Sequence, residues 1–116
     1  MTDYKQAVLL RIFIGESDEY GGIPLHEAIV LKAREMGMAG ATVLRGPMGF
    51  GRSSRLHTSK ILRLSEDLPI VIEMVDTEQK IERLIGATEP MLGSSLVTTE
   101  KVNVVRYGHD RELSDG

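Results

Sequence analysis

The residues best suited to bind a ligand are concentrated in the stretch 45–60, RGPMGFGRSSRLHTSK. This stretch carries four basic side chains and three glycines but no carboxylate, although the whole chain has a net charge of −3. Glycines let backbone N–H groups come close to an anion, and arginine can donate two parallel hydrogen bonds to a phosphate. The residues concerned are Arg45, Gly46, Gly49, Gly51, Arg52, Arg55 and Lys60. This composition indicates an anion site, and a polar loop that contacts a partner protein explains it equally well.

The spacing of these glycines fits no standard phosphate-binding loop. The segment GPMGFGRSS lacks the spacing of a Walker loop and of a dinucleotide-binding fingerprint, and it is not set between a strand and a helix. The nearby serines have only His57 as a possible base, and neighbours within one loop lack the fixed geometry of a catalytic pair. We therefore predict no catalytic site.

A dedicated metal site is not expected either. The three histidines lie far apart in the sequence, without the short spacing of metal ligands, and the chain has no cysteine. They are His26, His57 and His109. An acidic turn at Glu16, Asp18 and Glu19 could ligate a hard cation, but it is more typical of a solvated turn before a helix.

Length and composition indicate one globular domain that spans residues 1–116. The absence of cysteine excludes disulfides and thiol catalysis. A pI near 5.6 and only five Phe and Tyr residues argue against a nucleic-acid-binding protein, which needs a basic face or aromatic stacking platforms. The N-terminal residues resemble neither a signal peptide nor a membrane span, so we expect a cytoplasmic protein.

The hydrophobic pattern predicts four strands and two helices. Apolar residues alternate with others in the strands, predicted at 6–14, 41–45, 68–75 and 101–107. One helix begins at Pro24 and stops at Gly37, and the other has Asp76 as its N-cap and should kink or end at Pro90. The order βαββαβ predicts an α+β, ferredoxin-like sandwich with both helices on one face of an antiparallel sheet. The long loop covers about 46–60, and the polar tail 108–116 is expected to be loosely packed.

The other face of this sheet is predicted to be open and half apolar. The two central strands place six residues on it, namely Leu9, Arg11, Phe13, Val71, Glu73 and Val75. We expect Arg11 and Glu73 to form an ion pair across these strands. A second subunit should cover such a face, although a small solvated face on a monomer is an alternative.

Several segments resemble those of PII signal-transduction proteins. The similar pieces are GFGR at 49–52, His57 with Thr58, Leu68 with Pro69, and Ile72 with Glu73. The longer segments LRIFIGESD, GATVLRGPMGFG, LHTSKILRLSEDLP and VTTEKV resemble an uncharacterised PII-like family within the wider PII and CutA superfamily. The resemblance extends over nearly the whole chain. It implies a homotrimer, a loop that changes conformation, and an adenine nucleotide bound in the clefts between subunits.

The resemblance also implies which residues contact the nucleotide. They are Arg45, Gly46, Gly49, Phe50, Gly51 and Arg52 at the base of the loop, together with Lys101. Lys101 falls near the lysine of the PII phosphate-binding turn, between the second helix and the last strand. This chain has TTEK where PII has GDGK, so Glu100 adds negative charge there, and AMP or ADP is favoured over ATP. An ordinary connection between helix and strand is the alternative for this segment.

The predicted function is that of a non-enzymatic signalling protein. The trimer senses an adenine nucleotide, and the loop 45–60 then engages or releases a partner protein, with a membrane transporter or channel suggested by analogy. A CutA-like metal-ion-binding or ion-tolerance protein is the alternative. No bound metal and no nucleic acid are expected for the signalling protein.

Overall fold

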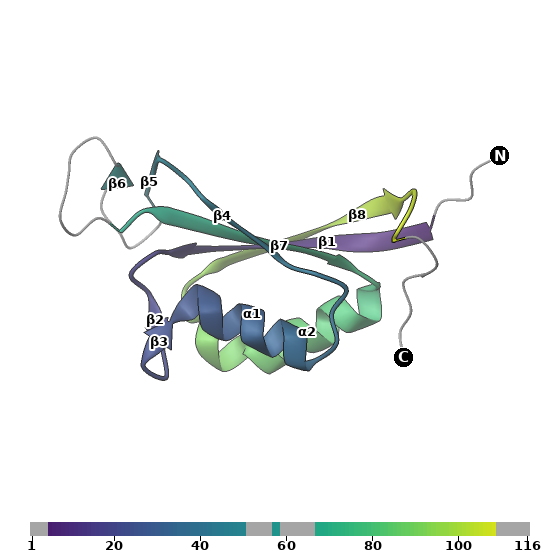
Figure 1. Ribbon diagram of the computed structural model, residues 1–116, viewed down its shortest axis with the longest axis horizontal. Helices are drawn as coiled ribbons and strands as arrows, with labels where there is room; N and C mark the ends of the chain where they lie inside the picture. The colour runs from purple at the N-terminus through teal and green to yellow at the C-terminus, as the bar shows by residue number, and fades with distance from the viewer. Residues whose placement is uncertain (1–4, 51–56, 59–66, 109–116) are drawn as a thin grey trace.

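The computed structural model describes residues 5–50, 57–58 and 67–108, and Figure 1 shows a four-stranded sheet with two helices packed on one face. The sheet has the order β4-β7-β1-β8, and every neighbouring pair is antiparallel. Its strands are β1 (Lys5–Gly15), β4 (Thr42–Arg45), β7 (Pro69–Asp76) and β8 (Leu96–Val104). The helices are α1 (Leu25–Glu35) and α2 (Glu78–Leu92). The predicted α+β, ferredoxin-like arrangement is confirmed.

Two short ribbons complete the described structure, and the sequence did not predict either of them. In the first ribbon, β2 (Glu19–Tyr20) pairs with β3 (Ile23–Pro24) directly before α1 in the chain. The second joins β5 (Met48–Gly49) to β6 (His57–Thr58) at the start of the long loop. A pair of two-residue strands is too short to show an alternating pattern.

The core lies between the sheet and the helices. Every second residue of β1 is buried, because successive strand side chains point to opposite faces and this face carries the helices. Both helices turn one apolar stripe toward the sheet. The fully buried aliphatic side chains are Leu10, Ile12, Ile29, Ile70, Ile72, Met74, Ile81 and Leu84.

The start of α2 differs from the prediction. Asp76 is the last residue of β7, and Thr77 is the N-cap, with its hydroxyl accepting a hydrogen bond from the Lys80 N–H at 3.3 Å. The carboxylate of Asp76 is already occupied by the N–H groups of Ala39 and Thr77, so it does not cap the helix.

The end of α2 differs as well. The helix continues through Pro90 to Leu92 instead of ending there. Proline lacks the N–H that would bond to the carbonyl four residues back, and here that residue is the exposed Gly86, whose carbonyl can turn to water.

The last strand begins earlier and ends earlier than predicted. β8 pairs with β1 from Leu96, opposite Phe13, to Val104, opposite Lys5. The predicted last strand exists, but its bounds, 101–107, were wrong. β8 is an edge strand in which the polar run TTEK at 98–101 resembles a loop, although Val97, Thr98 and Thr99 favour extended backbone. Only Gly93, Ser94 and Ser95 connect α2 to β8.

The strand register orders the open face into rows across the sheet. The row nearest the long loop is wholly apolar, and the next row is polar with a central ion pair. The first row consists of Leu44, Val71, Phe13 and Leu96, and the second of Thr42, Glu73, Arg11 and Thr98.

The predicted pair of Arg11 with Glu73 is confirmed and has a third member. Arg11 Nε lies 2.9 Å from Glu73 Oε2, and Arg11 Nη1 lies 3.0 Å from Glu100 Oε1. The hydrogen bond with Glu73 is the main cause that raises the pKa of the Arg11 guanidinium, so this side chain stays charged. Glu100 therefore lies on the open sheet face beside Arg11, and the expectation that it lies at a phosphate-binding turn is wrong.

Candidate functional site

The base of the long loop is built on the first residue of β7. The N–H of Gly46 donates to the carbonyl of Pro69 at 2.8 Å. A Cβ atom on Gly46 or on Gly49 would lie 3.0 Å from Pro69 Cγ, so a side chain at either position would press against the Pro69 ring. These glycines therefore allow the loop to pack closely against the sheet, a role that the sequence reasoning had not foreseen.

Arg45 is held at the loop base by an acidic residue. Its Nη2 lies 2.5 Å from Oε2 of Glu16, which follows β1 directly. The backbone N–H of Glu16 donates to the carbonyl of Leu68 at 2.8 Å, so the acidic turn is fixed to the same end of the sheet. Within this turn the Gly15 N–H donates to Asp18 Oδ2 at 2.9 Å. Among the described residues no cluster of three Asp, Glu or His side chains could hold a metal ion.

The structure brings together four of the seven predicted site residues. Arg45, Gly46, Gly49 and Phe50 lie in sequence at the loop base, and the Phe50 side chain is largely exposed. Gly51 and Arg52 lie outside the described residues, so their role stays a prediction.

Lys101 does not lie with the others. It is within β8 opposite Val8, five residues beyond Leu96, which places it about 17 Å along the strand from the loop end of the sheet. The expectation that Lys101 lies at the turn between the second helix and the last strand is therefore wrong. A ligand at the loop base of the same chain is out of its reach.

A pocket of about 760 Å³ lies on the open sheet face, at the end opposite the long loop. Its floor includes Leu9, Glu73 and Val75, and its walls are residues 39–42 and 102–107. The sequence reasoning missed this pocket because it assigned the residues after Val104 to a strand. They instead turn back across the sheet, so that Tyr107 reaches Ala39 beside the opposite edge strand.

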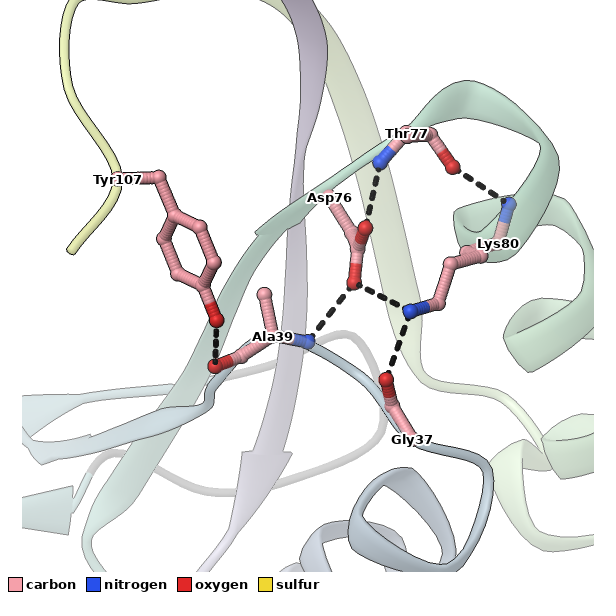
Figure 2. A network of polar contacts seen from close by, with 6 residues as sticks. All are labelled: Gly37, Ala39, Asp76, Thr77, Lys80 and Tyr107. Atoms are coloured by element: carbon pink, nitrogen blue, oxygen red, sulfur yellow. Dashed lines mark hydrogen bonds and ion pairs between the residues drawn. The ribbon is translucent and has the colours of Figure 1, made fainter. Parts of the chain in front are cut away.

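A buried polar network, drawn in Figure 2, includes Ala39, which lines one wall of this pocket. Asp76 is fully buried, and its two carboxylate oxygens accept from the N–H groups of Ala39 and Thr77 at 2.8 Å each. Lys80 Nζ lies 3.6 Å from Asp76 Oδ2 and donates to the carbonyl of Gly37 at 2.7 Å. The segment between α1 and β4 is therefore tied to the start of α2.

Tyr107 joins the second wall to the first. Its hydroxyl donates to the carbonyl of Ala39 at 3.3 Å, from the side opposite to Asp76 (Figure 2). Ala39 is thus bonded through its N–H to Asp76 and through its carbonyl to Tyr107. Asp76 was detectable in the sequence, because it continues the buried alternation of Ile72 and Met74.

The loop base and the pocket lie at opposite ends of one sheet. β7 begins with Pro69 at the loop base and reaches the pocket at Glu73, a separation of about 14 Å along the strand, and the pocket extends on to Val75. None of the loop-base residues lines the pocket, so the two are separate regions of the same chain.

Comparison with known proteins identifies the family. The family model for DUF190, described as "Uncharacterized ACR, COG1993", matches residues 7–104. The chain belongs to the DUF190 family. A UPF0166 protein of Aquifex aeolicus (strain VF5) is 36% identical over 99 residues, which cover 84% of this chain and 91% of the relative.

Solved structures of PII-like and CutA proteins have the same fold as this DUF190 protein. CPII of Thiomonas intermedia K12, described as a nitrogen regulatory PII-like protein bound to ADP, AMP and bicarbonate, has a TM-score of 0.71 and 17% identity, covering 91% of this chain and 94% of CPII. The divalent ion tolerance protein CutA1 of Ehrlichia chaffeensis has a TM-score of 0.56 and 11% identity, covering 83% and 80%. At these identities the likeness shows the fold alone. The predicted resemblance to an uncharacterised family with a PII-like fold is thus confirmed: the family is DUF190, and its fold is shared with PII-like proteins.

Neither helix in the described part of this DUF190 protein is long and apolar enough to span a bilayer.

Proposed function

We propose that this DUF190 protein is a non-enzymatic regulatory protein that binds an adenine nucleotide between neighbouring subunits of a homotrimer. AMP or ADP is the favoured ligand, and the loop 45–60 transmits binding to a partner protein. The observation that carries this proposal is the separation of the loop base and the pocket at opposite ends of one sheet. Two copies that meet head to tail can bring the loop base of one against the pocket of the next.

The pocket suits the base of the nucleotide. Its volume falls within the usual range for small-ligand sites, and Leu9 and Val75 supply apolar surface for a flat ring. The exocyclic amino group of adenine is a hydrogen-bond donor, and the carboxylate of Glu73, a lining residue, is an acceptor. Loss of these contacts should weaken the binding of an adenine nucleotide more than the binding of inorganic phosphate.

The loop base suits the phosphate end. Arg45 is more than half exposed and carries a charge that a phosphate can share. Gly51 and Arg52 follow directly in the chain and are proposed to add backbone N–H groups and a second guanidinium. Lys101 remains a proposed contact only from a neighbouring subunit, because it lies far from the loop base of its own chain.

The open face supports the trimer. Its apolar row contains Leu44, Phe13 and Leu96, each with substantial exposed surface, which favours coverage by another protein. A contact between two different patches is heterologous, and such contacts form a ring when the rotation between neighbouring subunits closes. A three-membered ring of this kind would bury the open faces and create three equal clefts.

Solved relatives of the same fold lend support by analogy. CPII binds ADP and AMP according to its description, and that property belongs to CPII. By the same analogy, we propose a cytoplasmic location and a membrane transporter or channel as the partner.

Isothermal titration of the whole protein with AMP, ADP, ATP and cyclic AMP tests the proposal. We expect AMP or ADP to bind with one site per chain and a dissociation constant below about 1 mM. Thr42→Trp, which fills the pocket, and Arg45→Glu, which reverses the charge at the loop base, should each weaken binding at least about tenfold. Lys32→Ala on α1 is the control. If no adenine nucleotide binds below about 1 mM, the proposal fails.

A CutA-like ion-tolerance protein is the second candidate, and the fold likeness to CutA1 is the observation in its favour. Copper or zinc should then raise the melting temperature, and His57→Ala should remove the effect. No increase with either metal would leave the nucleotide proposal as the better account.

A further inference from the structure

We propose that Glu16 determines how much negative charge the ligand at the loop base can carry. Its ion pair with Arg45 would favour nucleotides with short phosphate chains over ATP. This inference rests on the proposed function, because it assigns a specificity-determining residue to the same site. It also replaces Glu100 as the source of the discrimination, since Glu100 is paired with Arg11 on the open sheet face.

The backbone of Glu16 is fixed in place. Its N–H donates to the carbonyl of Leu68 at 2.8 Å, and the N–H of the next residue, Ser17, donates to Asp67 Oδ1 at 2.6 Å. On the other side, the backbone of Gly15 passes so close to Asp67 that a Cβ atom would lie 2.7 Å from a carboxylate oxygen. The backbone of Glu16 therefore stays in place when a ligand approaches, and its carboxylate stays within one side-chain length of that backbone.

Arg45 is the movable member of the pair. Its side chain is 58% exposed, compared with 30% for Glu16, and it ends the edge strand β4. An exposed ion pair is easily exchanged for another partner. A phosphate that approaches Arg45 either displaces Glu16 or shares the guanidinium with it.

In both cases the carboxylate of Glu16 stays close to the bound anion. The repulsion between them grows with the charge of the ligand, because each added phosphate group brings further negative charge near the same carboxylate. AMP meets the least repulsion, ADP more, and ATP the most. Glu16 thus sets the order of the affinities for AMP, ADP and ATP, and not only their magnitude.

Glu16→Gln tests this inference, because glutamine keeps the shape of the side chain and removes its charge. The matched control is Glu19→Gln, which removes a charge from an exposed residue of the adjacent ribbon. Titration with AMP, ADP and ATP at one fixed low ionic strength gives the ratio of the ATP to the AMP dissociation constant for each variant.

We expect Glu16→Gln to shift this ratio about fivefold in favour of ATP, from the Coulomb energy of two further charges at about 8 Å in water. The control should shift the ratio less than about twofold, and the difference should shrink in high salt as charges are screened. Glu16→Asp, which keeps the charge, should preserve the preference for AMP.

The possible results separate the two proposals. If the wild type binds nucleotide and Glu16→Gln leaves the ratio within about twofold of wild type, the role of Glu16 is overturned and the proposed function stands. If neither the wild type nor any variant binds a nucleotide, the proposed function fails, and this inference fails with it. Melting temperatures from circular dichroism establish that the variants are folded.

Discussion

Replacing Asp76 with asparagine should lower the free energy of unfolding by about 2–4 kcal/mol, although the side chain keeps its shape. The Asp76 carboxylate is fully buried and offers an oxygen to each of two backbone N–H groups (Figure 2). Asparagine has one oxygen and one amide nitrogen. In either orientation, the amide hydrogens face the N–H of Ala39 or the N–H of Thr77.

The magnitude comes from two losses. A buried N–H left without an acceptor costs about 1–3 kcal/mol. Lys80, whose side chain is only 13% exposed, also loses the charge that lies 3.6 Å from its ammonium group. Lys80 keeps its hydrogen bond to the Gly37 carbonyl, so we expect the second loss to add only about 1 kcal/mol. A domain of this size commonly has about 5–15 kcal/mol of stability, so the variant should still fold.

Urea denaturation followed by far-ultraviolet circular dichroism measures this change, because the chain has no tryptophan. The protein concentration must be equal for all variants, since subunit association adds to the apparent stability. Glu78→Gln, at an exposed position in the first turn of α2, is the control and should change stability by less than about 0.5 kcal/mol. If Asp76→Asn also stays within about 0.5 kcal/mol of wild type, our reading of the network is refuted.

Three further predictions follow from single contacts. Tyr107→Phe removes one hydrogen bond and should speed amide hydrogen exchange in the segment after β8 without changing it in the core strands; equal exchange in that segment would contradict the role of this tyrosine. Gly15→Ala places a Cβ against Asp67 and should destabilise by about 1–3 kcal/mol, whereas Gly86→Ala, with open space around its Cβ, should stabilise by about 0.5–1 kcal/mol in the same urea assay. Phe13→Asp on the open face should dissociate the oligomer in light-scattering measurements, and an unchanged mass would argue that this face is not buried between copies.

The central strands and both helices were predictable because their signals are local. The alternation in β1 and β7 sets the buried face, and Pro24 and Gly37 mark the limits of α1. The pair between Arg11 and Glu73 followed from the same pattern, since the two strands are neighbours in any ferredoxin-like sheet. The PII-like resemblance pointed to the same order of elements.

The errors came from places where tertiary contacts outweigh local signals. β8 contains the polar run TTEK at 98–101, which joins the strand by pairing with β1, so the start at Leu96 could not be seen in composition. Pro90 was assigned too strong an effect, since an exposed helix end tolerates one missing hydrogen bond.

The candidate site was predictable only in part. The glycines and Arg45 stand together in the sequence, so composition alone indicated the loop base. The pocket combines four segments far apart in the chain, and the pair of Glu16 with Arg45 joins residues on different strand ends. The periodicity of the sequence does not reveal such contacts. The one usable signal was that Asp76 continues the alternating buried positions of β7.

Mixing two defective variants tests the central claim most directly, namely that one ligand site is shared between two copies. Arg45→Glu impairs the loop base, Thr42→Trp impairs the pocket, and each variant alone should bind almost no AMP or ADP while keeping the oligomeric state of wild type. After the two are unfolded and refolded together in equal amounts, a head-to-tail ring should regain binding at about one quarter of its sites, where an intact loop base meets an intact pocket. If the mixture binds no more nucleotide than the separate variants, the shared site is contradicted.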